Sequence, residues 1–259
     1  MSRRRLLQVA AAAAAAPAAT VRSGTAEGAV GTLVPAYFHP AVAPGGWRRL
    51  ADPGPHSVVL NVASGPGEVP DPVFQRAVQA VRDAGGTVTA YVDVSYARRD
   101  PALVEEDLRR YRAWYGVSDV FFDQAPAAPD ALPYLRAVTE SARVSGAALV
   151  VLNHGTHPDP GYLALADVLV TFEGPASAYL SLTPPSWTRA HPRHRFCHLV
   201  HTCPSGTLLR VLTRARDRAG LLYVTDRSLP NPYDRLPPHF PHLLPSGVRW
   251  GGWSAEADG

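Results

Sequence analysis

The chain has 259 residues, of which 46% are hydrophobic and 18% are charged. This composition can fill a large buried core, and it excludes a chain that is disordered throughout. The formal net charge is only +3, and the 25 basic residues are all arginines scattered along the sequence. A dedicated nucleic-acid surface would gather them in a patch or stripe, so we expect no nucleic-acid partner.

The first residues, "MSRRRLLQVAAAAAAAPAAT", join a basic start to a short apolar run and small residues. This order is typical of a targeting segment, and residues 2–8 resemble a twin-arginine export signal. An ordinary secretory signal is the alternative. Because the apolar run is shorter than the ~20 residues that span a bilayer, we expect a secreted monomer without a membrane anchor. The expected divisions are residues 1–28 as signal and linker, 29–245 as catalytic domain and 246–259 as a tail.

Only two cysteines occur, Cys197 and Cys203, in one strand-like run, "RFCHLVHTCP". In an extended chain they would lie roughly 20 Å apart at ~3.3 Å per residue, whereas a disulfide needs Cα atoms within about 7 Å. We therefore expect no disulfide between them. Two cysteines alone also do not make a zinc signature.

Eight apolar, β-rich runs alternate with helical patterns along the chain. Such near-continuous runs are typical of strands buried on both faces of a parallel sheet. They are residues 31–38, 57–63, 87–94, 119–124, 148–155, 167–174, 196–202 and 220–226. Eight strand-then-helix units predict a single-domain α/β fold, the (β/α)8 barrel, with an open doubly wound sheet as the alternative. No Gly-x-Gly-x-x-Gly turn follows the first run, and we expect no cofactor.

The helical stretches have readable ends. Asp71 and Asp100 each precede a proline, which predicts an N-cap carboxylate before a first-turn proline. Glycines follow the helical stretches at the places where a left-handed C-cap residue is expected. They are Gly85, Gly86, Gly116, Gly146 and Gly220.

In a (β/α)8 barrel the chemistry lies at the carboxyl ends of the strands. Nearly every predicted strand ends in polar or aromatic side chains, and the set as a whole indicates a carbohydrate site. They are Tyr37, His39, Asn61, Ser64, Asp93, Tyr96, Asp123, Gln124, Asn153, His154, Glu173, His201, Thr202 and Asp226. Tyr37, Tyr91, Tyr96 and Tyr223 either stack on sugar rings or pack the barrel wall.

Two of these strand ends carry carboxylates directly after apolar sequence, Asp123 after "VFF" and Glu173 after "LVTF". An apolar wall disfavours the charged form of a carboxylate, so the pKa values of such a pair can be set apart. Glycoside hydrolysis needs a pair of this kind, one acid for the leaving oxygen and one carboxylate for the anomeric carbon or for water. Asp123 and Glu173 are therefore the predicted catalytic residues.

Several ordered stretches resemble the spherulin-4-like proteins, a spherulation-specific family whose characterised fungal members are secreted glycoside hydrolases acting on galactosaminogalactan. The resemblance runs from about Thr32 to His242. It rests on "VPAYFHP", "LNVASGPG", "YVDVSYARR", "YRAWYGVSDVFFDQ", "VLNHGT", "FEGP" and "YVTDRSLPNPYDRLPPHF". The resemblance implies a (β/α)8 barrel that cleaves α-1,4-linked N-acetylgalactosamine internally and with retention, without a metal.

The same resemblance implies roles for individual residues. Asp123 matches the first acid of the family's Asp-Glu dyad and is expected to be the nucleophile, and Glu173 matches the later Glu and is expected to be the acid/base; the exchange of these roles stays open. Substrate-binding roles are expected for Tyr37, His39, Asn61, Tyr91, Asp93, Tyr96, Gln124, Asn153, His201, Tyr223, Asp226 and Asn231. The sequence departs from the family at Gln124, which replaces the Glu of the dyad, and at Asp93, where the family tends to have an aromatic residue.

An amide has nearly the shape of a carboxylate but cannot ionise, so Gln124 leaves two readings open. Either it is a tolerated neighbour of Asp123 in a working hydrolase, or the protein is a polysaccharide-binding barrel without activity. A third reading is a metal-dependent deacetylase, because His154, His157 and Asp159 follow one another closely. Zinc would need three such ligands converging on one point.

Overall fold

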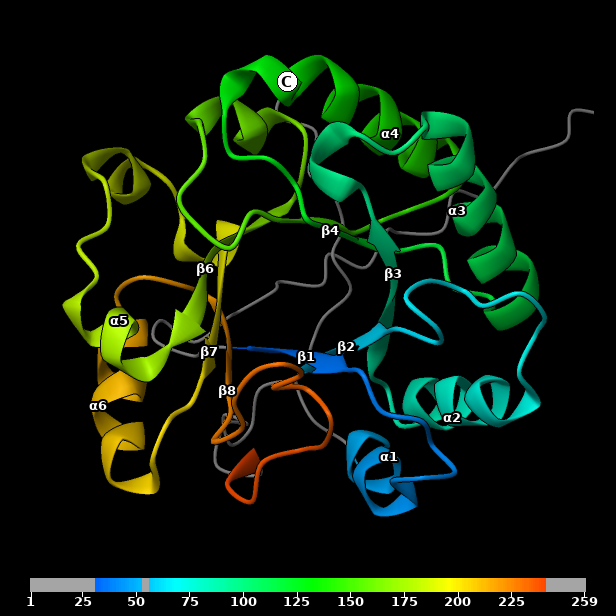
Figure 1. Ribbon diagram of the computed structural model, residues 1–259, viewed down its shortest axis with the longest axis horizontal. Coiled ribbons are helices and arrows are strands. Elements are labelled where there is room, and N and C mark those ends of the chain that lie inside the picture. Colours follow the sequence, from blue (N-terminus) through cyan, green and yellow to red (C-terminus); the bar gives the residue numbers. More distant parts are fainter. Residues whose placement is uncertain (1–30, 53–55, 241–259) are drawn as a thin grey trace, which may run out of the picture.

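The computed structural model describes residues 31–52 and 56–240. Eight parallel strands pair in chain order, β1 to β8, and form a ring that is surrounded by helices (Figure 1). The strands are β1 Thr32–Ala36, β2 His56–Leu60, β3 Thr87–Asp93, β4 Val120–Asp123, β5 Val150–Asn153, β6 Val168–Pro175, β7 Phe196–His201 and β8 Leu221–Val224. All eight predicted strands are therefore confirmed. A parallel bridge between Gly31 and Leu221 joins β8 to the entry of β1, and the (β/α)8 barrel is confirmed with it.

Six α-helices occur in the described residues. They are α1 Pro44–Leu50, α2 Pro72–Asp83, α3 Pro101–Tyr115, α4 Leu132–Val144, α5 Ala176–Ser181 and α6 Ser205–Ala215. The prediction of eight strand-then-helix units is thus wrong for two units. A short 3-10 helix, Pro160–Ala164, takes the place of a helix between β5 and β6.

Between β8 and Phe240 the described chain forms turns and bends but no helix. Its prolines remove backbone donors and clash with the preceding turn, which prevents a helix from forming. The segment instead lies between β8 and α1, where it is coloured orange to red in Figure 1. It is anchored there by Phe240, which is buried with its ring 6.1 Å from that of His56. The proline-rich run at residues 229–245 predicts a rigid segment that wraps the barrel, and the position of residues 229–240 agrees with this; residues 241–245 lie outside the described residues.

The predicted helix ends are mostly present. Asp71 accepts hydrogen bonds from two backbone N–H groups of α2, and Asp100 caps α3 in the same way. Gly85, Gly116 and Gly146 have positive φ angles, as a left-handed C-cap requires. The prediction is wrong for Gly86 and Gly220, whose φ angles are not positive. A Cβ at Gly220 would lie 2.5 Å from the Cα atom of His194. Close backbone packing therefore explains this glycine.

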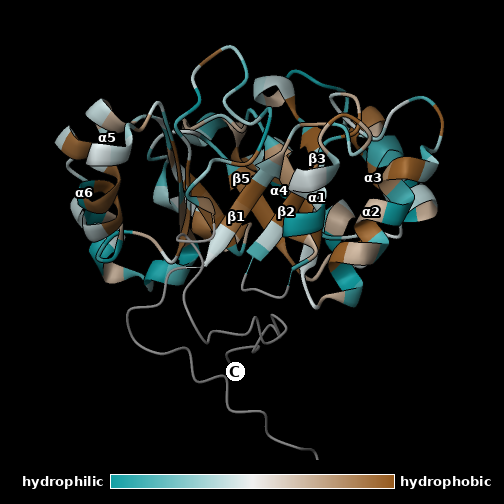
Figure 2. Cartoon of the chain, turned by 90° about the horizontal axis from the view of Figure 1, so that it is seen from below, coloured by the Kyte–Doolittle hydropathy of each residue, from teal (hydrophilic) through white to brown (hydrophobic). Residues whose placement is uncertain are grey.

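The barrel is filled and coated by apolar side chains. Hydrophobic colour concentrates on the strands and on the inner sides of the helices, whereas hydrophilic colour collects on loops and outer helix faces (Figure 2). Cys197 and Cys203 are both buried and are not joined by a disulfide. None of the described helices is long and apolar enough to cross a membrane.

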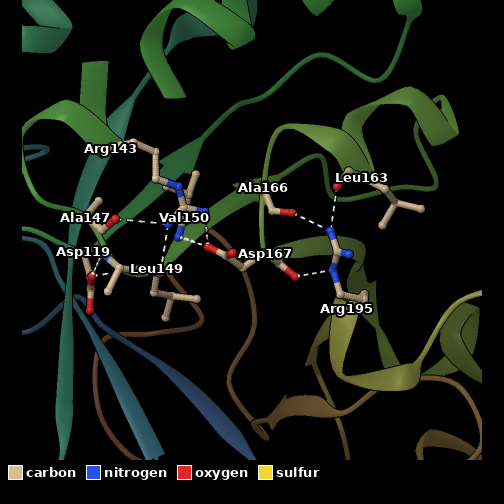
Figure 3. A network of polar contacts seen from close by, with 10 residues as sticks. Asp119, Arg143, Ala147, Leu149, Val150, Leu163, Ala166, Asp167 and Arg195 are labelled. Atoms are coloured by element: carbon tan, nitrogen blue, oxygen red, sulfur yellow. Dashed lines mark hydrogen bonds and ion pairs between the residues drawn. The ribbon is translucent and has the colours of Figure 1, made fainter. Parts of the chain in front are cut away.

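At the amino-terminal end of the strands, charged side chains hold backbone groups around β5 (Figure 3). Asp167 Oδ2 accepts hydrogen bonds from the backbone N–H of Val150 at 2.7 Å and from the Arg143 guanidinium at 2.5 Å. Asp119 accepts two further backbone N–H groups at the entry to β5. Arg195, which directly precedes β7, donates to three backbone carbonyls that precede β6. This network lies at the amino-terminal face of the barrel, where residues contribute to stability, and away from the carboxyl-terminal face, where active sites of such barrels lie.

Candidate active site

A cavity of about 680 Å³ opens at the carboxyl ends of the strands. Its walls come from the ends of β1, β2, β3, β6 and β7 and from the segment that follows β8. The lining residues are Tyr37, Asn61, Val62, Ser64, Tyr91, Glu173, His201, Leu229, Pro230, Asn231, Pro232 and Tyr233. Six predicted site residues therefore line one cavity: Tyr37, Asn61, Tyr91, Glu173, His201 and Asn231.

Asn153, at the end of β5, connects the two predicted catalytic carboxylates. Its Nδ2 donates to Asp123 Oδ1 at 2.7 Å and to Glu173 Oε2 at 2.8 Å. Since both oxygens contact one nitrogen, they are at most the sum of these distances apart, about 5.5 Å. The strands β4, β5 and β6 are neighbours in the sheet, which brings the three side chains together.

The orientation of the Asn153 amide follows from a second contact. Its Oδ1 accepts the backbone N–H of Gly155 at 3.1 Å, so the amide nitrogen faces the carboxylates. Gly155 has a φ of 64°, in the left-handed region that favours glycine. Its carbonyl in turn accepts the N–H of Glu173 at 2.9 Å. This glycine therefore holds both Asn153 and the strand that carries Glu173.

A bulge in β6 directs Glu173 into the barrel. The register against β7 shifts just before Phe172. The Thr171 hydroxyl contacts the ring of His198 at 3.1 Å, and the Phe172 ring packs on Tyr179 of the outer helix α5 at 5.0 Å. Two consecutive side chains thus face outward, and the next one, Glu173, faces inward. If this same sequence formed a regular strand after Thr171, alternation would turn Phe172 inward and Glu173 out of the barrel.

Two tyrosine hydroxyls complete the set of donors to the carboxylates. Tyr91 donates to Asp123 Oδ2 at 2.8 Å, and Tyr233 donates to Glu173 Oε1 at 2.6 Å. Tyr37 lies between them, with its ring centroid 5.4 Å from each of the two tyrosine rings. Tyr233 belongs to the proline-rich run at residues 229–245, which predicts a rigid segment with Asn231 and Tyr233 as candidates to reach the rim; only Asn231 was included in the predicted site. The stretch "NPYD" within the family resemblance was the available signal.

Burial and the neighbouring Glu173 carboxylate raise the pKa of Asp123 to about 6. Desolvation is the larger cause, because it disfavours the charged form of a carboxyl inside the barrel. The hydrogen bonds from Tyr91 and Asn153 act in the opposite direction, because they favour the carboxylate. Asp123 therefore changes its charge near neutral pH, where it can serve acid–base or nucleophilic chemistry.

Gln124 and Asp93, the two departures from the family pattern, are hydrogen-bonded to each other. Gln124 Nε2 donates to Asp93 Oδ2 at 3.1 Å. Within the described residues the Gln124 side chain has no hydrogen bond to Asp123 or Glu173. Its backbone has a φ of 56°, which turns the side chain away from the direction that a regular strand would give it. A glutamate here would instead bring a second carboxylate toward Asp93.

Eight of the fourteen predicted site residues are not part of the cavity lining. Four of them, Asp93, Asp123, Gln124 and Asn153, make the hydrogen bonds described above, and the other four lie elsewhere. His39 pairs with the N-cap carboxylate Asp71 at 3.0 Å. Tyr96 is 54% exposed on the turn after β3, with the Arg98 guanidinium over its ring. Tyr223 is fully buried inside the barrel, and Asp226 is exposed after β8. For Tyr223 the structure favours the packing role over stacking on sugar, because the hydroxyl and ring are enclosed by protein.

The histidines of the deacetylase reading do not converge. The ring of His154 donates through Nδ1 to the Pro126 carbonyl at 2.9 Å, and burial lowers its pKa to about 4. His157 packs on Trp187, with ring centroids 6.3 Å apart. Over residues 31–52 and 56–240 no group of three or more His, Cys, Asp or Glu side chains is arranged to hold a metal ion.

Comparison with known proteins places these features in a family. The model of "Spherulation-specific family 4" matches residues 31–245. Spherulin-4 of Physarum polycephalum is 30% identical over 211 residues, a match that covers 75% of this chain and 62% of that protein. The crystal structure of Aspergillus clavatus Sph3 in complex with GalNAc superposes with a TM-score of 0.68 at 25% identity, covering 83% of this chain and 96% of that one.

Proposed function

The chain belongs to spherulation-specific family 4, and from this we propose that it is an exported glycoside hydrolase that cleaves an α-1,4-linked polymer containing galactosamine or N-acetylgalactosamine. The observation that carries the proposal is the pair of carboxylates, Asp123 and Glu173, held on one amide nitrogen of Asn153. A similar barrel, that of Sph3, was crystallised with GalNAc, which supports an amino sugar as the bound unit.

The spacing of the pair supports retention of the anomeric configuration. The facing oxygens are at most about 5.5 Å apart, and retaining glycosidases have carboxyl groups ~5–5.5 Å apart. Inverting enzymes need ~6.5–9.5 Å, because a water molecule must fit between the carboxylate and the sugar. No such space separates these two oxygens.

In the proposed reaction Asp123 is the nucleophile and Glu173 the acid/base. An Asp123 oxygen bonds to the anomeric carbon while Glu173 gives its proton to the departing glycosidic oxygen. Glu173 then takes a proton from water, and the resulting hydroxide displaces Asp123 from the sugar. Tyr91, Tyr233 and Asn153 keep both carboxylates oriented through these two steps.

The cavity walls fit a sugar. Tyr37 and Tyr91 offer ring faces and hydroxyls, and Asn61, His201 and Asn231 offer hydrogen-bonding groups beside Glu173. Such a mixture of aromatic faces and polar groups suits a ring that has one apolar side and many hydroxyls. Its opening at the barrel mouth leaves room for a polymer to extend beyond one unit.

The proposal is tested by the release of reducing ends from α-1,4-N-acetylgalactosamine oligomers and from galactosaminogalactan. We expect turnover in the wild-type chain and losses of at least about a thousandfold in Asp123→Asn and Glu173→Gln, the range typical when a catalytic group is removed. Glu105→Gln, which changes an exposed carboxylate on α3, is the control. Full activity in either carboxylate variant would overturn the assignment.

The second candidate, a binding barrel without activity, was favoured by Gln124. The structure gives that amide another partner, Asp93, and leaves the Asp123–Glu173 pair complete. We therefore expect Gln124→Glu to leave turnover unchanged or to lower it, because the new carboxylate repels Asp93. A wild-type chain that binds oligomers without cleaving them, and gains turnover in Gln124→Glu, would favour the binding barrel.

A further inference from the structure

A short loop that follows β8 and includes the start of the proline-rich run places Tyr233 against Glu173. The loop comprises residues 227–234 and is called here the Tyr233 loop. Five consecutive members of it, residues 229–233, form one wall of the cavity. Tyr233 is buried, with 4% of its surface exposed, whereas Leu229 is 69% exposed. Of these five residues, Tyr233 is the one whose side chain is hydrogen-bonded to Glu173.

The two ends of the Tyr233 loop are joined by a two-pronged ion pair. Arg227 Nε lies 3.0 Å from Asp234 Oδ1, and Arg227 Nη2 lies 3.0 Å from Asp234 Oδ2. The hydrogen bonds from Arg227 hold the pKa of the Asp234 carboxyl below its usual range. Parallel bonds of this kind fix the relative orientation of both side chains, unlike a single contact.

The root of the loop is fixed by backbone contacts that do not involve the Arg227 side chain. The Arg227 N–H donates to Thr225 Oγ1 at 3.1 Å, and its carbonyl accepts the N–H of Thr202 at 2.7 Å. Within the loop, Asn231 Oδ1 accepts the N–H of Tyr233 at 2.9 Å. On the other side of the loop, Leu236 and Phe240 are buried. Replacement of the guanidinium alone thus removes the link between the two ends of the loop and leaves both flanks in place.

We propose that the Arg227–Asp234 ion pair is a clamp that positions Glu173, acting through the hydroxyl of Tyr233. Arg227 and Asp234 are positioning residues, since neither lines the cavity, and Tyr233 transmits their effect through its 2.6 Å hydrogen bond. This inference rests on the proposed function for its kinetic readout. It adds two residues that control the orientation of the acid/base from outside the cavity. Both belong to the segment that follows β8.

The ion pair is half-exposed, with 36% and 39% of the two side chains accessible. Pairs of this kind contribute little to global stability. Its loss should therefore loosen the loop without unfolding the barrel. If the Tyr233 hydroxyl becomes mobile, the Glu173 carboxylate is less well oriented in the transition state. This lowers the turnover number more than it raises KM.

The test compares Arg227→Gln, Tyr233→Phe and the double variant on N-acetylgalactosamine oligomers. We expect Tyr233→Phe to lower kcat by about tenfold to a hundredfold, as the loss of one hydrogen bond to a charged group does. Arg227→Gln should lower kcat by about tenfold and add nothing in the Tyr233→Phe background, because both act on one contact. Arg227→Lys keeps the positive charge but loses one of the two hydrogen bonds to Asp234. Its kcat should lie between those of wild type and Arg227→Gln.

Arg235→Gln is the matched control, because Arg235 Nε lies 3.7 Å from the same Asp234 carboxylate but outside the loop. It should keep wild-type kcat. Deuterium exchange gives a readout without turnover: residues 228–234 should exchange faster in Arg227→Gln and at the wild-type rate in Arg235→Gln.

Additive effects of Arg227→Gln and Tyr233→Phe, or an effect of Arg227→Gln confined to KM, would overturn the clamp. If the wild-type chain releases no reducing ends, the proposed function fails. Deuterium exchange then tests the clamp by itself. An unchanged exchange rate of residues 228–234 in Arg227→Gln would refute it.

Discussion

Asn153 places one neutral donor between two acids that would otherwise repel each other. Its two N–H groups satisfy one oxygen of Asp123 and one of Glu173, and each remaining oxygen is met by a tyrosine hydroxyl, Tyr91 or Tyr233. Buried carboxylates need such partners, since an unpaired buried charge is costly. The arrangement leaves the pair ready for proton transfer without a cation among its described neighbours.

This arrangement sets the pH dependence that we expect. Since the pKa of Asp123 is raised to about 6, this proposed nucleophile is protonated below that pH and ionised above it. Turnover should therefore rise with pH through about 6. Tyr91→Phe removes a hydrogen bond that lowers this pKa, so the rise should move to higher pH.

The measurement is a pH profile of kcat/KM from pH 4 to 8 for wild type, Tyr91→Phe and the control Tyr134→Phe, whose hydroxyl binds the Arg99 carbonyl outside the site. Turnover that falls with pH through about 6 would mean that Asp123 is the acid and that the two roles are exchanged.

The residues at the carboxyl ends of individual strands were the part of the candidate site that could be predicted from sequence. A polar residue directly after an apolar run, such as Asp123 or Asn153, marks the mouth of a parallel barrel. The contacts between these residues could not be predicted, because they depend on side-chain direction. Gln124 shows this: its left-handed backbone directs the amide to Asp93, and nothing in the local sequence reports that turn.

The strands were predicted more reliably than the connections between them. Eight buried runs are long and strongly apolar, so their presence follows from hydrophobicity alone. The missing helices are different. The segment before β6 is rich in proline and glycine and forms only a 3-10 helix, and the segment after β8 lies beside α1 as turns and bends. The bulge that turns Glu173 inward was also beyond sequence, since one extra residue leaves no compositional mark.

At the opposite end of the barrel, Asp167 connects α4 to β5 and should matter for stability only. Asp167→Asn replaces the charged acceptor of Val150 N–H and of Arg143. We expect a loss of about 1–3 kcal/mol in the free energy of unfolding, the range for hydrogen bonds to a charged group.

Chemical denaturation provides the measurement, with Glu105→Gln, an exposed carboxylate on α3, as the control. The turnover number of the folded Asp167→Asn enzyme should equal that of wild type. A loss of turnover at unchanged stability would show that this network reaches the site.

The molecule as a whole separates these tasks between the two ends of one barrel. Ion pairs and backbone hydrogen bonds hold the amino-terminal end, and the carboxyl-terminal end carries the cavity, the strained strand ends and the clamped loop. The chain belongs to spherulation-specific family 4, and the similar barrel of Sph3 was crystallised with GalNAc. The proposal that the cavity cleaves an amino-sugar polymer rests on these two findings and on the carboxylate pair.

The most direct measurement of that proposal is the anomeric configuration of the first product. Proton NMR would follow cleavage of an α-1,4-N-acetylgalactosamine oligomer before mutarotation equalises the anomers. The short distance between Asp123 and Glu173 leads us to expect the α-anomer first. A β-anomer that appears first, or the absence of any cleavage, would contradict a retaining hydrolase built on these two carboxylates.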